Sequence, residues 1–305
     1  MLKSIRAALA VGVMTLSAFG ASSALAEPLK VVASFTIIAD FAKNVGGDRI
    51  NLTTIVGPDG DAHVYEPSPA DAVAMAGADV VLVNGLHFEG FLQRLVDASA
   101  TKATIAVLTK GVTPINFKPE FADADAAEGE DTDPHAFQSV ANAKVYVKNI
   151  ADAFCTADAE GCDGYKANAA AYTKKLDALE GEVLTAIQSI PKEKRVVITS
   201  HDAFGYFEKA YGLTFLAPEG VSTESEPSAA DVAKLVGQVK QDKAAVFIEN
   251  ITNARLIEQI ASETGTKVGG TLYSDALSQP DGPASTYIDL MHNNIAQIKG
   301  AILGS

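Results

Sequence analysis

Gly57-Pro-Asp-Gly-Asp-Ala-His-Val-Tyr-Glu-Pro-Ser-Pro-Ala-Asp71 is the stretch on which the predicted fold of this chain depends. The run before it, Leu52 to Val56, is apolar or β-branched and predicts a short buried strand, which the Gly-Pro-Asp-Gly turn then ends. His63 is therefore predicted to lie in a loop at the carboxyl edge of a sheet. Open α/β sheets bind their ligands along this edge.

Helix is predicted to begin again at Ser68. A serine can cap a helix, Pro69 suits the first helical position, and the carboxylate of Asp71 favours the positive end of the helix. The segment Glu226-Pro-Ser-Ala-Ala-Asp231 repeats this pattern in the second half of the chain. The two halves are therefore expected to be built alike, each with a loop between a strand and a capped helix.

Apolar runs alternate with helical patterns along both halves of the chain. The predicted strands are residues 30–35, 52–56, 80–84 and 104–108, followed by 196–199, 214–217, 245–249 and 267–272. Strands separated by helices of about ten residues or more form parallel sheets with right-handed crossovers. The sequence thus predicts an α/β fold of two lobes, each a four-stranded parallel sheet flanked by helices, with a cleft between the strand ends.

A long helix is predicted between the two halves. Apolar residues recur at steps of three and four from Tyr165 to Ile190, and Pro191 stops the pattern. At about 1.5 Å per residue this helix is roughly 40 Å long. On this basis the predicted divisions are a signal segment 1–26, an N-terminal lobe 27–162, a connecting helix 163–191 and a C-terminal lobe 192–305.

The first 26 residues have the pattern of a secretory signal peptide. Lys3 and Arg6 precede an apolar stretch, and Ala24-Leu-Ala26 offers a cleavage site of small residues. The apolar stretch is shorter than the ~20 residues that span a membrane. Because no cysteine stands at the cleavage site, we expect the mature protein to be free in the periplasm and not lipid-anchored.

The chain is acidic, and its acidity is unevenly distributed. Its formal charge of −14 becomes −16 when Lys3 and Arg6 leave with the signal segment, which argues against nucleic acid or anionic lipid as a partner. Segment 118–133 contains seven acidic residues and one lysine. It is predicted to be either a solvated, disordered insertion or a loop that collects cations near a site.

Cys155 and Cys162 are the two cysteines of the chain. Their short separation, in a protein bound for an oxidising compartment, favours a disulfide that closes a small loop. A thiolate metal site is the alternative, although no histidine lies near the pair in sequence.

Further motifs accompany the stretch around His63. They are Asn84-Gly-Leu-His-Phe-Glu-Gly90, Asp133-Pro-His135, Thr199-Ser-His-Asp-Ala-Phe204 and Glu226-Pro-Ser-Ala-Ala-Asp231. In these motifs and their order, the sequence resembles the solute-binding receptors of zinc and manganese ABC importers, the cluster A-I group, and its zinc-type members in particular. The resemblance covers nearly the whole mature chain.

This resemblance implies a receptor that captures its metal in the cleft and delivers it to a permease and an ATPase. It implies that the long helix is the single rigid connection between the lobes, so that the lobes move less on binding than those of hinged receptors. We expect a monomer that could also receive its metal from a periplasmic metallochaperone. The histidine-rich loop of many zinc-type members is missing, since segment 118–133 contains no histidine.

The resemblance also implies the metal ligands. It assigns them to His63, His135, His201 and Asp275, two from each lobe. Three neutral imidazoles and one carboxylate suit zinc, whereas manganese usually gains more oxygen ligands. We therefore expect Zn(II) as the bound substrate, with a manganese-specific or dual receptor as the alternative. The other two histidines, His87 and His292, are expected at the surface.

An exported zinc hydrolase is the competing class. Catalytic zinc needs an open coordination position and a general base, and four protein ligands leave little room. Glu66 and Asp202 are the candidate bases beside the ligands, and each has an ordinary role as a helix-cap neighbour or as an outer partner of the ligands. No Gly-x-Ser-x-Gly motif and no metalloprotease helix motif occurs. The sequence therefore predicts a binding protein and not an enzyme.

Overall fold

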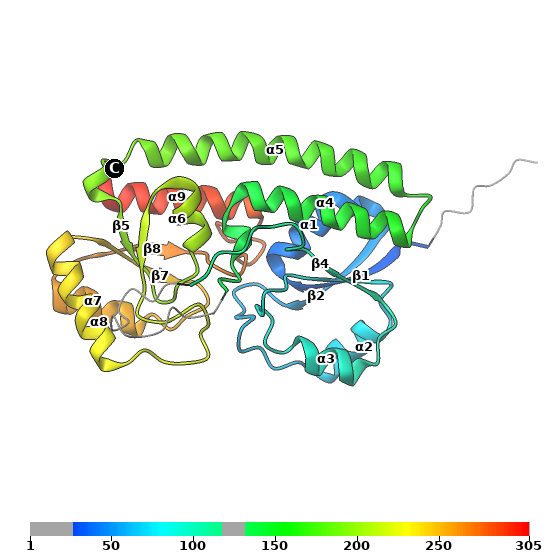
Figure 1. Cartoon of the computed structure of the whole chain (residues 1–305), viewed down its shortest axis with the longest axis horizontal. Coiled ribbons are helices and arrows are strands. Elements are labelled where there is room, and N and C mark those ends of the chain that lie inside the picture. The colour runs from blue at the N-terminus through cyan, green and yellow to red at the C-terminus, as the bar shows by residue number, and fades with distance from the viewer. Residues whose placement is uncertain (1–26, 118–131, 305) are drawn as a thin grey trace, which may run out of the picture.

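The computed structural model describes residues 27–117 and 132–304. The predicted signal segment 1–26 and residues 118–131 of the acidic segment lie outside the described residues. Figure 1 shows two lobes side by side, with one long helix lying along both.

The first lobe is built on a parallel sheet with the strand order β2-β1-β3-β4. Its strands are β1 (Leu29–Phe35), β2 (Ile50–Val56), β3 (Val80–Val83) and β4 (Thr104–Val107). Its helices are α1 (Thr36–Gly46), α2 (Pro69–Ala76) and α3 (Leu92–Ser99), with a short 3-10 turn η1 (Gly47–Arg49). Val31 of the central strand β1 pairs with Leu52 on one side and with Val80 on the other. The central strands are buried on both faces, which explains their unbroken apolar runs.

The second lobe repeats this plan with the strand order β6-β5-β7-β8. Its strands are β5 (Val196–Ile198), β6 (Thr214–Leu216), β7 (Ala245–Glu249) and β8 (Val268–Leu272). Its helices are α6 (Gly205–Tyr211), α7 (Ala229–Asp242), α8 (Arg255–Thr264) and α9 (Tyr287–Leu303), with a short turn η3 (Lys192–Lys194). The prediction of two four-stranded parallel sheets flanked by helices is confirmed.

Equivalent serine caps start the helices after the second strand of each lobe. In α2 the Ser68 side chain accepts the backbone N–H of Asp71, and the Asp71 side chain accepts the N–H of Ser68. In α7 the Ser228 side chain accepts the backbone N–H of Asp231. Each cap satisfies a helix N–H that would otherwise lack a partner, so the sequence repeat reflects a structural repeat.

One long helix, α5 (Cys162–Gln188), connects the two lobes, and a second long helix of the first lobe, α4 (Val140–Ala157), leads into it. A disulfide joins Cys155, in the last turn of α4, to Cys162, the first residue of α5. The 27 residues of α5 give it a length of about 40 Å, and it lies along both lobes with α9 beside it (Figure 1). It ends just before Pro191, which lacks the N–H that a continuing helix needs.

The main hydrophobic core is continuous across both lobes. It joins residues of β1 and α1, such as Val31 and Phe41, to residues of the second lobe, such as Phe204 and Leu290. A smaller cluster lies within the second lobe alone and includes Leu235 and Ile257 of α7 and α8. The core is shared because α5 packs against α1 and α4 of the first lobe and against α6 and α9 of the second. Relative motion of the lobes would therefore disturb shared packing.

Within the described residues, no helix is both long enough and apolar enough to cross a membrane.

Candidate metal centre

Four buried side chains converge where the two sheets face each other. They are His63, His135, His201 and Asp275, and one ligand atom from each lies within 4.8 Å of all the others. His63 is 4% exposed, and the other three are fully buried. The structure thus brings together the four residues that the sequence resemblance implied.

Strand ends and one short turn position these side chains. His63 follows β2, His201 follows β5, and Asp275 follows β8, so three of the four stand beyond the carboxyl ends of parallel strands. His135 precedes the 3-10 turn η2 (Ala136–Gln138). Because the two lobes present these edges to each other, residues from both halves of the chain meet at one point.

Asp275 is at the centre of the group. Its Oδ2 atom lies 3.1 Å from Nε2 of His201 and 3.4 Å from Nε2 of His63, and its Oδ1 atom lies 3.6 Å from Nε2 of His135. The Nε2 atoms of His63 and His135 are 3.2 Å apart. All three imidazoles therefore direct the same ring atom toward one carboxylate.

Several of these buried polar atoms make no well-formed hydrogen bond in the described part of the chain. They are both carboxylate oxygens of Asp275 and the Nε2 atom of His201. Burying a polar group without a partner is costly, and native proteins rarely leave such groups unsatisfied. A divalent cation among the four side chains would satisfy Nε2 of His201 and the oxygens of Asp275 together, so the donor set fits a metal ion.

A buried carboxylate faces the far nitrogen of two of the imidazoles. Oδ1 of Asp133 lies 2.8 Å from Nδ1 of His135, and Oε2 of Glu249 lies 2.7 Å from Nδ1 of His201. A carboxylate in this position favours a proton on Nδ1 and leaves Nε2 free to bind a metal. Neither carboxylate was singled out from the sequence as an outer partner of the ligands.

Backbone hydrogen bonds hold these two carboxylates in place. Oε1 of Glu249 accepts the N–H groups of Ser200 and His201, and Oδ1 of Asp133 accepts the N–H of His135. Each carboxylate thus positions both the backbone and the ring of its histidine. A signal for Glu249 existed in the sequence, because it is an acidic residue at the end of an apolar strand.

The charges of the site shift the pKa values of its members. Burial lowers the pKa of His135, but Asp275 and Asp133 outweigh this effect and raise it to about 9. Burial likewise lowers the pKa of His201, and Glu249 and Asp275 raise it well above its usual value. Burial raises the pKa of Asp275, yet His135 and His201 hold it well below its ordinary value. A cation must therefore displace protons from the metal-free site at neutral pH.

His63 differs from the other two histidines. Burial is the largest influence on its ring and lowers its pKa. Its backbone N–H donates to Oδ1 of Asp61 at 2.9 Å. The ring of Phe88 packs edge-on against it, with 4.8 Å between the ring centres. His63 is thus available as a neutral ligand near pH 7.

The motif from Asn84 to Gly90 supports the site from one side. Phe88 also packs against His135, with ring centres 5.6 Å apart. The side-chain amide of Asn84 donates to the carbonyl of Pro134 at 2.9 Å and so fixes the loop that carries His135. The buried Glu89 accepts the N–H of Asn84. This motif therefore positions two of the candidate ligands without supplying one.

The two residues that the sequence suggested as outer partners of the ligands, Glu66 and Asp202, differ in burial. Glu66 follows the loop of His63 in sequence, but its side chain is exposed to solvent and lies 3.6 Å from Arg94, so it does not support the ligands. Asp202 is half-buried and follows His201 directly. Burial, with Asp133 as the next cause, raises the pKa of Asp202 to about 7.

His87 and His292 are surface residues, as expected. His87 has a left-handed backbone with φ of 63°. Nε2 of His292 on α9 lies 2.7 Å from Oε2 of Glu182 on α5.

Two parallel-sheet lobes around a buried cluster of three histidines and one aspartate are typical of the two-lobe, metal-binding solute receptors. The profile of the family described as "ZnuA: Zinc-uptake complex component A periplasmic" matches residues 31–301. The chain belongs to this family, whose members are metal-binding receptors of ABC importers and work with permease and ATPase subunits. They are not enzymes, so the predicted absence of catalysis agrees with the family.

The names of individual relatives refer to different metals. The manganese-binding lipoprotein MntA of Halalkalibacterium halodurans is 34% identical over 270 residues, covering 88% of this chain and 87% of that protein. The Mn-bound periplasmic metal-binding protein from Candidatus Liberibacter asiaticus is 31% identical, with a TM-score of 0.76, and the match covers 88% of this chain and 97% of that chain. The periplasmic zinc-binding protein TroA from Treponema pallidum is 30% identical, with a TM-score of 0.82, and the match covers 90% of this chain and 99% of that chain.

The comparisons contradict one expectation about location. We expected a protein free in the periplasm, because no cysteine stands at the predicted cleavage site. MntA and several other curated relatives are named as lipoproteins, so the relatives contradict the expectation of a freely secreted protein, while a place on the extracytoplasmic side agrees with them. Residues 1–26, which carried the expectation, lie outside the described residues.

Proposed function

We propose that this receptor captures Zn(II) with His63, His135, His201 and Asp275 as ligands and delivers it to its permease. The main support is the group of buried ligand atoms within 4.8 Å of one another, several of which have no hydrogen-bond partner in the described chain. A cation there offsets the cost of burying them.

The donor set favours zinc. Three imidazole nitrogens and one carboxylate oxygen form a four-coordinate set of the kind that Zn²⁺ takes with protein ligands. The carboxylates Asp133 and Glu249 raise the basicity of two of these imidazoles. With Asp275 they bring three negative charges close to a +2 ion, which favours retention of a divalent cation in a buried place.

Manganese is the second candidate. Both oxygens of Asp275 lie free of well-formed hydrogen bonds in the described chain, so this carboxylate could bind through both atoms and add an oxygen donor. Manganese favours oxygen donors more than zinc does. MntA is named for manganese, and the Liberibacter protein has been solved with manganese bound.

We also propose the lobe division 27–162, 163–191 and 192–305, and a monomer that could receive metal from a metallochaperone. The long helix α5 supports the division, since it lies between the two sheets in sequence. The monomer and the metallochaperone rest on the resemblance alone.

Elemental analysis of untagged protein, followed by competition titrations with zinc and manganese against a chelator, tests the proposal. We expect one equivalent of metal per chain and a zinc affinity well above that for manganese. Protein that takes up neither metal would refute the proposal. Manganese binding that matched zinc binding would replace zinc by the second candidate.

A further inference from the structure

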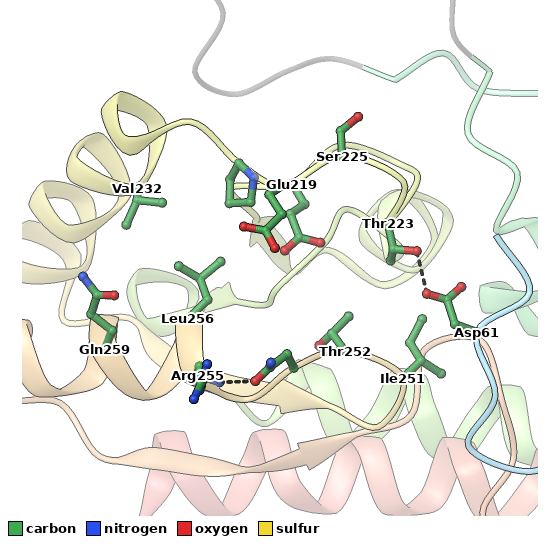
Figure 2. Close-up of a pocket in the computed structure, with 13 residues that line it drawn as sticks. Asp61, Glu219, Thr223, Ser225, Val232, Ile251, Thr252, Arg255, Leu256 and Gln259 are labelled. Carbon is green, nitrogen blue, oxygen red and sulfur yellow. Dashed lines mark hydrogen bonds between the residues drawn. The ribbon is translucent and has the colours of Figure 1, made fainter. Parts of the chain in front are cut away.

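One carboxylate connects the loop of His63 to the opposite lobe. Oδ1 of Asp61 accepts the backbone N–H of His63 at 2.9 Å, and Oδ2 of the same carboxylate accepts the hydroxyl of Thr223 at 2.5 Å. Asp61 belongs to the first lobe, and Thr223 lies between β6 and α7 of the second. Figure 2 shows Thr223 directed at Asp61 across this boundary. A metal ligand and the facing lobe are thus held by two atoms of one side chain.

Residues Val221 to Glu226, here called the strap, lie between two hollows. One hollow has a volume of about 490 Å³, and its lining includes His63, Phe88 and Glu224. The other has a volume of about 470 Å³, and its lining includes Asp61, Thr223 and Glu226 (Figure 2). A segment with open space on both sides can move without displacing core side chains.

The strap also touches the first lobe near the metal centre. A side chain at Gly90 would place its Cβ 3.2 Å from Oε1 of Glu224 and 2.7 Å from the carbonyl oxygen of His63. The absence of a side chain at Gly90 therefore lets the strap lie close to the loop of His63.

His63 is the ligand that lines one of these hollows, whereas His135, His201 and Asp275 are fully buried. A cation that exchanges between the ligands and solvent therefore has a route past His63 and the strap. Movement of the strap away from the first lobe would widen this route. The bond between Thr223 and Asp61 opposes that movement.

We propose that Asp61 and Thr223 are positioning residues that hold the strap closed beside His63 and set the rate at which the metal exchanges with solvent. This inference rests on the proposed metal function. Because the route serves both directions, the bond slows capture and release together. Its loss changes both rates more than it changes the equilibrium affinity.

The test uses the full mature chain loaded with Zn(II), mixed in a stopped-flow instrument with excess chromogenic chelator. Thr223→Val removes the hydroxyl and keeps the shape of the side chain. We expect zinc release to be about tenfold faster, because this factor corresponds to the loss of roughly one charge-assisted hydrogen bond. The rate of zinc capture should rise by a similar factor, leaving the dissociation constant within about threefold of wild type. Thr223→Ser, which retains a hydroxyl, should restore slow exchange.

Two controls separate this role from general loosening of the lobe. Thr264→Val removes a half-buried threonine hydroxyl that donates within helix α8 of the same lobe, and it should leave exchange unchanged. In an Asp61→Ala background, Thr223→Val should add no further acceleration, since the bond is already absent. Thermal unfolding of each variant shows whether it is folded.

Unchanged zinc release in folded Thr223→Val, or an equal effect of Thr264→Val, would overturn the inference while leaving the metal function intact. A wild-type protein that binds no zinc or manganese would instead refute the proposed function itself. A dissociation constant raised as much as the release rate, with capture unaltered, would also count against the strap, because it would indicate a loss of ligand affinity.

Discussion

Oδ1 of Asp133 lies 2.8 Å from Nδ1 of His135, and the same atom accepts the backbone N–H of that histidine. In the other lobe, Glu249 holds the ring and the backbone of His201 with its two oxygens. In each lobe, therefore, one carboxylate contacts both the ring Nδ1 and the backbone N–H of a histidine, although the two carboxylates come from different places in the chain. A histidine fixed in this way loses little freedom when it binds metal, since its ring is already oriented.

Removal of a ligand imidazole should abolish tight binding. We expect His135→Ala to weaken zinc binding by more than about a hundredfold, because even the loss of an outer partner costs up to about that much. His87→Ala and His292→Ala, which change surface histidines, are the matched controls and should stay within about twofold of wild type. Competition titration with a chelator measures all three. If His87→Ala were as harmful as His135→Ala, the ligand assignment would fail.

The outer carboxylates should matter without touching the metal. Glu249→Gln keeps the shape of the side chain but removes the negative charge that faces Nδ1 of His201 and raises the basicity of its ring. Zinc affinity should therefore fall by about 10- to 100-fold. Glu66→Gln is the control, because Glu66 is an exposed carboxylate beside Arg94. An isothermal titration in which Glu249→Gln bound zinc as tightly as wild type would show that this carboxylate has no role in ligation.

Zinc affinity should rise with pH well above the ordinary pKa of imidazole, which is about 6.5. His135 has a pKa of about 9 in the metal-free site, so it carries a proton at pH 7 that zinc must displace. The pKa of His201 is raised as well. Affinity should therefore increase by at least about tenfold per pH unit between pH 7 and 8.5, with protons released on binding. Calorimetry in buffers of different ionisation enthalpy counts these protons; none released at pH 7.5 would contradict the assignment.

The same shift has a consequence for the metal-free protein. A histidine whose pKa is raised on folding stabilises the folded state fully below the unfolded value of about 6.5, and this stability is lost as the pH rises through the folded value. We therefore expect the midpoint temperature of thermal unfolding of the metal-free protein to decrease as the pH rises from about 6.5 to 9, because His135 loses its proton over this range. His135→Gln should flatten this part of the profile. A midpoint that rose across this window in the wild type would be the opposite of what is expected.

His201 should influence the choice between metals. Glutamate at this position would give two imidazoles and two carboxylates, a harder set that favours manganese relative to zinc. The buried Glu249, 2.7 Å from the present imidazole, would repel a second carboxylate, so the change is best made as His201→Glu with Glu249→Gln. Both metals are titrated into this protein and into Glu249→Gln alone. The idea fails if the zinc-to-manganese affinity ratio of the double variant is equal or larger.

Local patterns were enough to predict the architecture. The alternation of apolar runs and helical patterns predicted the eight strands, each within two residues of its observed ends, because burial on both sheet faces leaves a continuous apolar signature. The caps at Ser68 and Ser228 were predictable for the same reason, since a helix N-terminus is satisfied by residues next to it in sequence. Three of the four candidate ligands stand in the quoted motifs and the fourth, Asp275, came from the family resemblance, because nothing in their spacing would have grouped them.

Only the tertiary structure decided which side chains support these four. Glu66 is a candidate outer partner from the sequence, yet it faces solvent, while Glu249 reaches His201 from a strand 48 positions further along the chain. The bond between Asp61 and Thr223 spans 162 positions and has no local signature. The core shared by both lobes could not be predicted from the sequence either, because it depends on the packing of the long helices against one another and not on their periodicity. Sequence periodicity reports which face of an element is buried; which distant residue meets that face is determined when the whole chain packs.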